Sequence, residues 1–246
     1  MVHPHMEYCT QPITFQVKRQ SLSGVLYIPK STSSRPGVVM YHGRGSSKKR
    51  YTDRAEMLAK AGFVTLVFDF RGCGESEGSF EDQTIAMGFE DARAGFDFLI
   101  GQERVDPNRV GVYGGSFGGY HAVLVSEQRS VKSLMLEAPA VCKDEWWNIT
   151  PESIEETRRS IYREINDIDS AKVFKSVEKY AGNVLIIEHE HDEIIPKRMT
   201  HAYYNHAIHA IKRELKVFKD APHALHDEKL RSKSNKLTVD WFTETL

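Results

Sequence analysis

Cysteines, long apolar runs and excess charge are all scarce in this chain of 246 residues. Its three cysteines, Cys9, Cys73 and Cys142, are far apart and odd in number, so the sequence predicts neither a disulfide framework nor a cysteine metal cluster. No stretch approaches the ~18 apolar residues of a membrane span, and the first residues lack a basic region followed by an apolar core. We therefore expect a cytoplasmic protein without a membrane partner.

The charges of the chain almost balance. Its 33 Lys and Arg residues face 34 Asp and Glu residues, which gives a formal net charge of −1. This balance argues against a partner chosen by bulk charge, such as nucleic acid. The sequence also has no internal repeat and no low-complexity tract. With 40% hydrophobic residues, a chain of this length can bury a sizeable core.

Short apolar runs alternate with helix-like segments along most of the chain. Strands are expected at 37–41, 63–68, 109–113, 133–137, 184–188 and 215–218, after an opening hairpin over 13–19 and 22–28. Helices are expected at 51–61, 85–100, 120–127 and 228–243. Such alternation implies right-handed crossovers and a mostly parallel sheet, which defines an α/β domain. We expect one domain over residues 1–246.

The alternation stops between Val141 and Gly182. This stretch is charged and helix-like, and it lies between two strands whose following loops face the same edge of the sheet. We expect it to form a short cap insertion, 141–182, over the strand ends. Trp146 and Trp147 come early in it, where the chain leaves the sheet, and we expect them to bind substrate. The alternative is that they pack the cap onto the domain.

A serine flanked by glycines lies where a predicted strand is followed directly by a predicted helix. The apolar run Val110–Tyr113 ends in Gly114-Gly115-Ser116-Phe117-Gly118, and a helix-like stretch follows without a linker. This order puts Ser116 at the apex of a tight corner, in which a Cβ at Gly114 or Gly118 would clash. The free amides of the following helix would favour a developing oxyanion. The alternative is a glycine-rich turn with an idle serine.

A nucleophilic serine needs a base and a group that orients the base. Asp192 follows the strand at 184–188, and His223 follows the strand at 215–218. In a parallel sheet both loops emerge at the edge that carries Ser116. His226 is an alternative base, and Glu137 is an alternative acid. A different interpretation of the 189–192 loop is that His189 and His191, on either side of Glu190, bind a metal.

Four motifs in this order resemble the α/β-hydrolase superfamily, and most of all its small carboxylesterases and serine aminopeptidase-like hydrolases. They are His42-Gly43 after a strand, Asp69-x-Arg71-Gly72-x-Gly74-x-Ser76, Gly114-x-Ser116-x-Gly118-Gly119, and Asp192 paired with His223. The resemblance covers nearly the whole chain. It implies an α/β-hydrolase fold of about eight mostly parallel strands, with helices on both faces and a short helical cap.

The same resemblance implies a role for each site residue. Ser116 would be the nucleophile, His223 the general base and Asp192 the orienting acid. The backbone amides of Phe117 and Arg44 would form the oxyanion hole, and residues 69–76 would be structural. Two positions depart from the usual pattern: Pro222 precedes the histidine where glycine is common, and Arg44 is a long cation where many relatives carry a smaller group. A preference for carboxylate-bearing substrates therefore stays open.

The function that the resemblance implies is hydrolysis of short acyl or aryl carboxylic esters, small-molecule substrates, through an acyl-enzyme with no metal or organic cofactor. A peptidase is the runner-up, because Gly-Gly-Ser-Phe-Gly-Gly resembles the elbow of prolyl oligopeptidase-like enzymes. Those enzymes usually carry an extra domain for which this chain has no room. A thioesterase and a catalytically silent binding protein of the same fold are two further hypotheses. The sequence predicts no oligomeric state.

Overall fold

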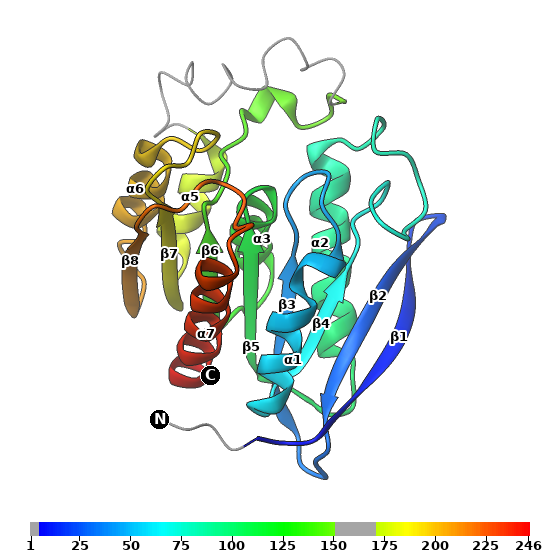
Figure 1. Ribbon diagram of the computed structural model, residues 1–246. Helices are drawn as coiled ribbons and strands as arrows, with labels where there is room; N and C mark the ends of the chain where they lie inside the picture. The colour runs from blue at the N-terminus through cyan, green and yellow to red at the C-terminus, as the bar shows by residue number, and fades with distance from the viewer. Residues whose placement is uncertain (1–4, 151–170) are drawn as a thin grey trace.

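The computed structural model describes residues 5–150 and 171–246 (Figure 1). These residues form an eight-stranded sheet with the order β1-β2-β4-β3-β5-β6-β7-β8. The strands are β1 (Tyr8–Val17), β2 (Gln20–Pro29), β3 (Arg35–Tyr41), β4 (Val64–Phe68), β5 (Val105–Gly115), β6 (Ser133–Glu137), β7 (Asn183–His189) and β8 (Lys212–Phe218).

The first two strands form the expected hairpin. β1 pairs antiparallel with β2 from Tyr8 opposite Pro29 to Val17 opposite Gln20. β2 in turn runs antiparallel to β4, whereas each pairing among β3 to β8 is parallel. The carboxyl ends of β3 to β8 therefore meet at one edge, from which the loops that follow these strands emerge.

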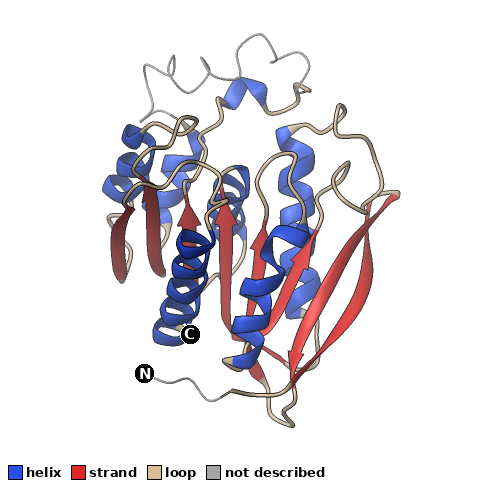
Figure 2. Ribbon diagram, in the orientation of Figure 1, coloured by secondary structure: helices blue, strands red, loops and turns tan. Residues whose placement is uncertain are grey.

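Helices cover both faces of the sheet (Figure 2). On one face lie α1 (Thr52–Lys60), which continues the short 3-10 helix η1 (Lys48–Tyr51), and α7 (Glu228–Thr245). On the other face lie α2 (Ile85–Ile100), α3 (Phe117–Gln128), α5 (Lys172–Lys179) and α6 (Lys197–His206). The predicted α/β fold, with a mostly parallel sheet between two helical layers, is confirmed. None of the helices in the described part of the chain is long and apolar enough to cross a membrane.

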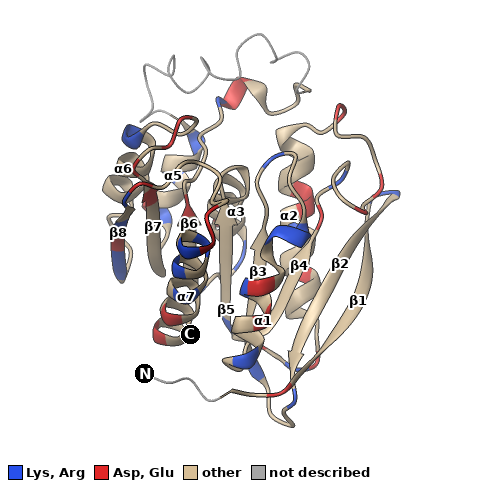
Figure 3. Cartoon of the chain, viewed as in Figure 1, with Lys and Arg blue, Asp and Glu red and all other residues tan. Residues whose placement is uncertain are grey.

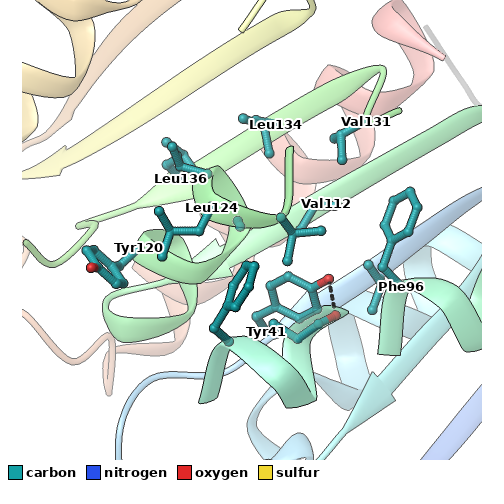
Figure 4. Packing of buried hydrophobic residues seen from close by; sticks show 14 of the residues in the cluster. Tyr41, Phe96, Val112, Tyr120, Leu124, Val131, Leu134 and Leu136 are labelled. Atoms are coloured by element: carbon teal, nitrogen blue, oxygen red, sulfur yellow. Dashed lines mark hydrogen bonds between the residues drawn. The ribbon is translucent and has the colours of Figure 1, made fainter. Parts of the chain in front are cut away.

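Each face of the sheet buries its own apolar cluster. The larger cluster packs side chains of β5 and β6 against α2 and α3, and Figure 4 shows part of it around Val112, Leu124 and Leu134. Tyr41 lies in the same cluster, where its hydroxyl donates a hydrogen bond to the carbonyl of Ala92 over 2.7 Å. This bond satisfies a buried polar atom and fixes α2 against the sheet beside the site.

The stretch expected to form the cap lies only partly within the described residues, because 151–170 fall outside them. Its beginning contains the 3-10 helix η2 (Asp144–Trp146). Its end forms α5, which packs beside α3 with Phe174 and Val177 buried. This end of the insertion is therefore a helix of the layer that covers the sheet. Its apolar face carries enough buried side chains to hold it there.

Candidate active site

Ser116 lies at the expected corner between β5 and α3. Its backbone has φ 51° and ψ −116°, a conformation that non-glycine residues rarely adopt and that is typical of strained functional turns. A Cβ added to Gly118 would lie 2.2 Å from the carbonyl oxygen of Tyr41, and one added to Gly114 would lie 2.5 Å from that of Gly118. The clash predicted for both glycines is therefore confirmed.

The structure brings Ser116, His223 and Asp192 together, although they come from three different loops. His223 Nε2 lies 3.1 Å from Ser116 Oγ, and His223 Nδ1 lies 2.8 Å from Asp192 Oδ2. A carboxylate only accepts hydrogen bonds, so Nδ1 carries the proton and donates it to Asp192. Nε2 is then free to accept the hydroxyl proton of Ser116.

Backbone groups hold the Asp192 carboxylate in place. Its Oδ1 accepts hydrogen bonds from the amides of Ile194 and Ile195, over 2.8 and 2.7 Å. The Asp192 side chain is 3% exposed, whereas that of His223 is 15% exposed. The acid is thus fixed and shielded, while the imidazole reaches the cavity.

His226, the alternative base, is exposed. Within the described residues its ring makes no hydrogen bond to Ser116, whose partner is His223. Its amide donates to the carbonyl of Ala224 over 2.8 Å, which closes a tight turn just after His223.

Glu137, the competing acid, is buried in a separate network. Its carboxylate accepts hydrogen bonds from Tyr113 Oη and from Ser234 Oγ, and it pairs with Arg54 Nη1 over 3.2 Å. Burial raises the pKa of Glu137, but the Arg54 charge and the neighbouring His189 outweigh it and hold the pKa well below its ordinary value. Glu137 is therefore an ionised carboxylate that is already fully partnered. It contributes to the site through its backbone, because its carbonyl accepts the Ser116 amide over 2.9 Å.

The histidines considered as metal ligands separate. His189 is 2% exposed and turns inward, with Nε2 3.6 Å from Glu137 Oε1. His191 turns outward, where its ring, Glu190 and Asp220 place one ligand atom each within 4.8 Å of one another. This surface group is the nearest arrangement to a metal site in that loop, and it does not include His189.

The residues expected to form the oxyanion hole flank Ser116. Phe117 is the first residue of α3, where backbone amides have no partner within the helix. Gly43 lies beside the nucleophile, since a Cβ added to it would be 3.5 Å from Ser116 Cβ. The next residue is Arg44, so its amide belongs to the Gly43–Arg44 peptide bond, which lies beside Ser116.

His42 orients that peptide. Its Nε2 accepts the Phe70 amide over 3.0 Å, so Nδ1 carries the proton and donates to the carbonyl of Gly43 over 2.7 Å. In a trans peptide the next amide points the opposite way, so the Arg44 N–H faces away from His42. Burial lowers the pKa of His42 to about 4, which keeps the ring neutral at neutral pH.

The 69–76 loop supports this arrangement from behind, as the resemblance implied. Asp69 accepts the Lys48 amide over 2.6 Å and pairs with Lys48 Nζ over 2.6 Å. The buried Arg71 pairs with Asp91 of α2, also over 2.6 Å. The loop therefore connects the His42–Lys48 segment to α2 and places no side chain on Ser116 or His223 within the described structure.

A cavity of about 620 Å³ opens at Ser116. Trp146 lies on its wall, whereas Trp147 is absent from the lining among the residues described. The ring of Trp147 packs instead on Phe89 of α2, with centroids 5.6 Å apart. Trp146 ends η2 and Trp147 follows it, and the two side chains leave the turn in different directions, so of the pair expected to bind substrate it is Trp146 that lines the cavity.

Arg44 and Cys142 also line the cavity. The Arg44 guanidinium lies 5.6 Å above the Phe80 ring and 5.7 Å from that of Phe117. Burial raises the pKa of Cys142 to about 12 and that of Cys73 to about 11, so both thiols stay protonated and are poor nucleophiles.

Sequence reasoning missed one side of this cavity. Arg50, Tyr51, Arg54 and Arg231 line it, and they come from η1, α1 and α7. The sequence gives only a weak indication that these residues line a cavity, because basic residues near helix ends are common on protein surfaces. Their joint position depends on the packing of α1 against α7, which no local pattern contains.

Fold and site together define an α/β hydrolase. Residues 49–246 match the prolyl oligopeptidase family, and the chain belongs to that family. The quorum-quenching protein AidA of Acinetobacter baumannii is 35% identical over 113 residues, which cover 45% of this chain and 37% of AidA. An uncharacterised protein of Mycobacterium tuberculosis is 34% identical over 118 residues, covering 48% of this chain and 41% of that protein. The chain thus matches about two fifths of the length of these relatives.

Solved structures share the fold along nearly the whole chain. Est1E from Butyrivibrio proteoclasticus, solved with ferulic acid bound, has a TM-score of 0.75 and 19% identity and covers 95% of this chain and 98% of its own. Dienelactone hydrolase from Anabaena variabilis has a TM-score of 0.72 and 19% identity, covering 97% and 99%. At this level of identity the likeness concerns the fold.

Proposed function

We propose that this protein is a serine hydrolase that cleaves carboxylic esters, with Ser116 as nucleophile, His223 as general base and Asp192 as the acid that orients it. The observation that carries the proposal is the continuous pair of hydrogen bonds from Asp192 Oδ2 through the imidazole to Ser116 Oγ. A serine alone is a weak nucleophile, and an adjacent base held in one tautomer activates it.

The proposed reaction proceeds in two halves. His223 Nε2 takes the Ser116 proton as Oγ bonds to the ester carbonyl carbon, and the negative charge moves to the carbonyl oxygen. The amides of Phe117 and Arg44 would stabilise this oxyanion. His223 then returns the proton to the alkoxide leaving group as the C–O bond breaks. Water, deprotonated by the same imidazole, attacks the acyl-enzyme and releases the acid and free Ser116.

Short acyl or aryl esters are the proposed substrates. The fold is shared with Est1E in its complex with ferulic acid, an aryl acid, which favours this class by analogy. The Trp146 ring on the cavity wall provides a flat apolar surface that suits such a group.

A peptidase is the second candidate, because residues 49–246 match the prolyl oligopeptidase family. The proposed triad would attack an amide by the same route, and a thioester likewise. What differs is the leaving group, which in a peptide is an amine that His223 must protonate.

One panel of substrates separates these activities. We expect 4-nitrophenyl esters to be hydrolysed, and aminoacyl anilides and acyl-CoA thioesters to be turned over far more slowly. Anilide cleavage without ester cleavage would favour the peptidase. A fluorophosphonate should label the wild type once, at Ser116, and Ser116→Ala should lower kcat by about 10⁴–10⁶-fold. Activity retained in Ser116→Ala would refute the serine mechanism.

A further inference from the structure

The cavity at Ser116 is more basic than the protein as a whole. Four arginines and two glutamates are found among its described lining residues, in a chain of formal net charge −1. The arginines are Arg44, Arg50, Arg54 and Arg231, and the glutamates are Glu137 and Glu193. Charges that line a cavity with apolar walls act on a bound group more strongly than the same charges in water.

Two of the arginines have structural roles. Arg54 donates from Nε to Asn235, from Nη1 to Glu137 and from Nη2 to Ser234, over 2.9, 3.2 and 2.7 Å. Arg54 and Glu137 therefore compensate each other. The guanidinium of Arg44 is stacked near two aromatic rings at the α3 side of the cavity.

Arg50 and Arg231 are different. Neither forms an ion pair with any residue in the described ranges 5–150 and 171–246. The side-chain contact of Arg231 is a long one, from Nη1 to the carbonyl of His226 over 3.5 Å. The charge of Arg50 acts on its neighbour Tyr51, whose pKa burial raises and the Arg50 charge partly lowers.

Both arginines belong to the same side of the cavity. Arg50 precedes Arg54 by four residues, and Arg231 precedes Ser234 by three, so each pair shares one helix face. Because Arg54 donates to Ser234, Arg50 and Arg231 lie one turn above that contact, toward the strand ends. Figure 3 shows basic segments at the upper ends of both α1 and α7. We call the space that Arg50, Tyr51, Tyr113, His189 and Arg231 line the α1–α7 chamber.

A buried histidine forms the floor of this chamber, and its contact with Glu137 is longer than a hydrogen bond. His189 is 2% exposed, lines the cavity, and has no hydrogen-bond partner for either ring nitrogen within the described structure. Burial disfavours its protonation, but the Glu137 carboxylate 3.6 Å away outweighs this and raises the pKa of His189. The long contact with Glu137 leaves the buried imidazole without a short hydrogen bond, and a ligand that accepts one would supply it.

We propose that the α1–α7 chamber binds a carboxylate of the substrate through Arg50 and Arg231, with His189 donating a hydrogen bond from the floor. This inference rests on the proposed ester hydrolysis and names its substrate class: esters that also carry a free carboxylate. Guanidinium groups bind carboxylates through paired, charge-assisted hydrogen bonds, which suits them to this role. Glu193 is the remaining acid of the lining, and it accepts the His223 amide over 3.2 Å.

Binding to an inactive protein tests this without relying on turnover. In the Ser116→Ala background, calorimetry compares 4-acetoxybenzoate with 4-acetoxybenzamide, and mono-4-nitrophenyl glutarate with its terminal amide. The two pairs place the carboxylate on either side of the scissile bond. We expect at least one carboxylate to bind about 10-fold more tightly than its amide, as charge-assisted hydrogen bonds predict. Raising the salt from about 0.05 M to about 0.5 M should reduce that ratio.

Variants identify the groups that cause the preference. Adding Arg50→Gln and Arg231→Gln should bring the ratio close to one, whereas the control Arg104→Gln, an exposed arginine before β5 at the opposite end of the sheet, should leave it unchanged. Equal binding of acid and amide in both pairs would overturn the proposal, as would a preference that survives the double substitution. Turnover of the four esters by the wild type is a separate readout, so failure of ester hydrolysis and failure of carboxylate binding are distinguishable.

Discussion

Two buried carboxylates lie at the carboxyl ends of the neighbouring strands β6 and β7, and their partners differ. Asp192 presents one oxygen to His223 and the other to two backbone amides. Glu137 has its oxygens taken by Arg54, Tyr113 and Ser234. A carboxylate in contact with a buried guanidinium is a poor partner for the imidazolium that the proposed reaction would form, because the charge of that carboxylate is already compensated.

Substitution of the two acids should therefore separate catalysis from stability. Asp192→Asn should lower kcat by up to about 10⁴-fold with little loss of fold, because it favours the wrong imidazole tautomer. Glu137→Gln leaves a buried arginine without its charge partner and should cost about 3–5 kcal/mol of unfolding free energy. Kinetics and urea unfolding of both variants measure this. A severe kinetic defect in folded Glu137→Gln, with a mild one in Asp192→Asn, would assign the acid to Glu137.

The two nearby histidines give a second test at single residues. His223→Ala should abolish turnover almost as fully as Ser116→Ala, because members of a triad act as a unit. His226→Ala removes an exposed ring three residues further on and should keep kcat within a few-fold of wild type. Comparable losses in both variants would mean that His223 acts on the loop and not on Ser116.

Trp146 ends the short helix η2 and Trp147 follows it, yet the two indole rings lie in different surroundings. Trp146→Ala should raise KM for aryl esters by about 10-fold, since it removes apolar contact area from the cavity wall. Turnover of acetate esters should change little. Trp147→Ala is the matched control, because its ring packs on Phe89, and it should lower stability without this selectivity. Equal effects of both substitutions on all esters would refute a role for Trp146 in selecting the acyl group.

Hydrophobic periodicity and turn residues predicted the helices and strands well where an element has a clear buried face or is buried throughout. The helix expected at 85–100 is α2 without a shift, and the strand expected at 133–137 is β6. The corner at Ser116 was predictable because the glycines that it requires, Gly114 and Gly118, lie within five consecutive residues and form a local pattern. The role of α5 was not, because a charged helix of eight residues shows its buried face only when α3 lies beside it. Arg50 and Arg231 were missed for the same reason.

Contacts between distant segments connect the site to the whole domain. Arg54 of α1, Glu137 of β6 and Ser234 of α7 form one buried polar network, and the Glu137 carbonyl connects it to the Ser116 amide. Phe70, His42 and Gly43 form another, which joins the ends of β4 and β3. Both networks form only when the sheet and its helices are assembled, so the geometry of the site and the stability of the fold depend on the same side chains.

This dependence predicts how the stability of the whole domain varies with pH. Burial lowers the pKa of His42 from its ordinary 6.5 to about 4, so between these values the unfolded chain binds a proton that the folded chain does not. The unfolding free energy should therefore fall as the pH drops through this window, by up to about 1.4 kcal/mol per unit from this residue. His42→Gln should show a shallower slope in urea unfolding measured from pH 7 to pH 4.

Other buried groups also titrate, some in the same direction as His42 and some, such as Asp91 with its raised pKa, in the opposite direction. The comparison between the wild type and His42→Gln therefore carries the result. Burial lowers the pKa of His121 to about 3, and this contribution is common to the wild type and to His42→Gln. Subtracting the two curves leaves the contribution of His42, which should reach its full size near pH 4 and vanish above about pH 7. Parallel curves for wild type and His42→Gln would show that His42 is not held neutral by the fold, and the orientation of the Arg44 amide would then need another cause.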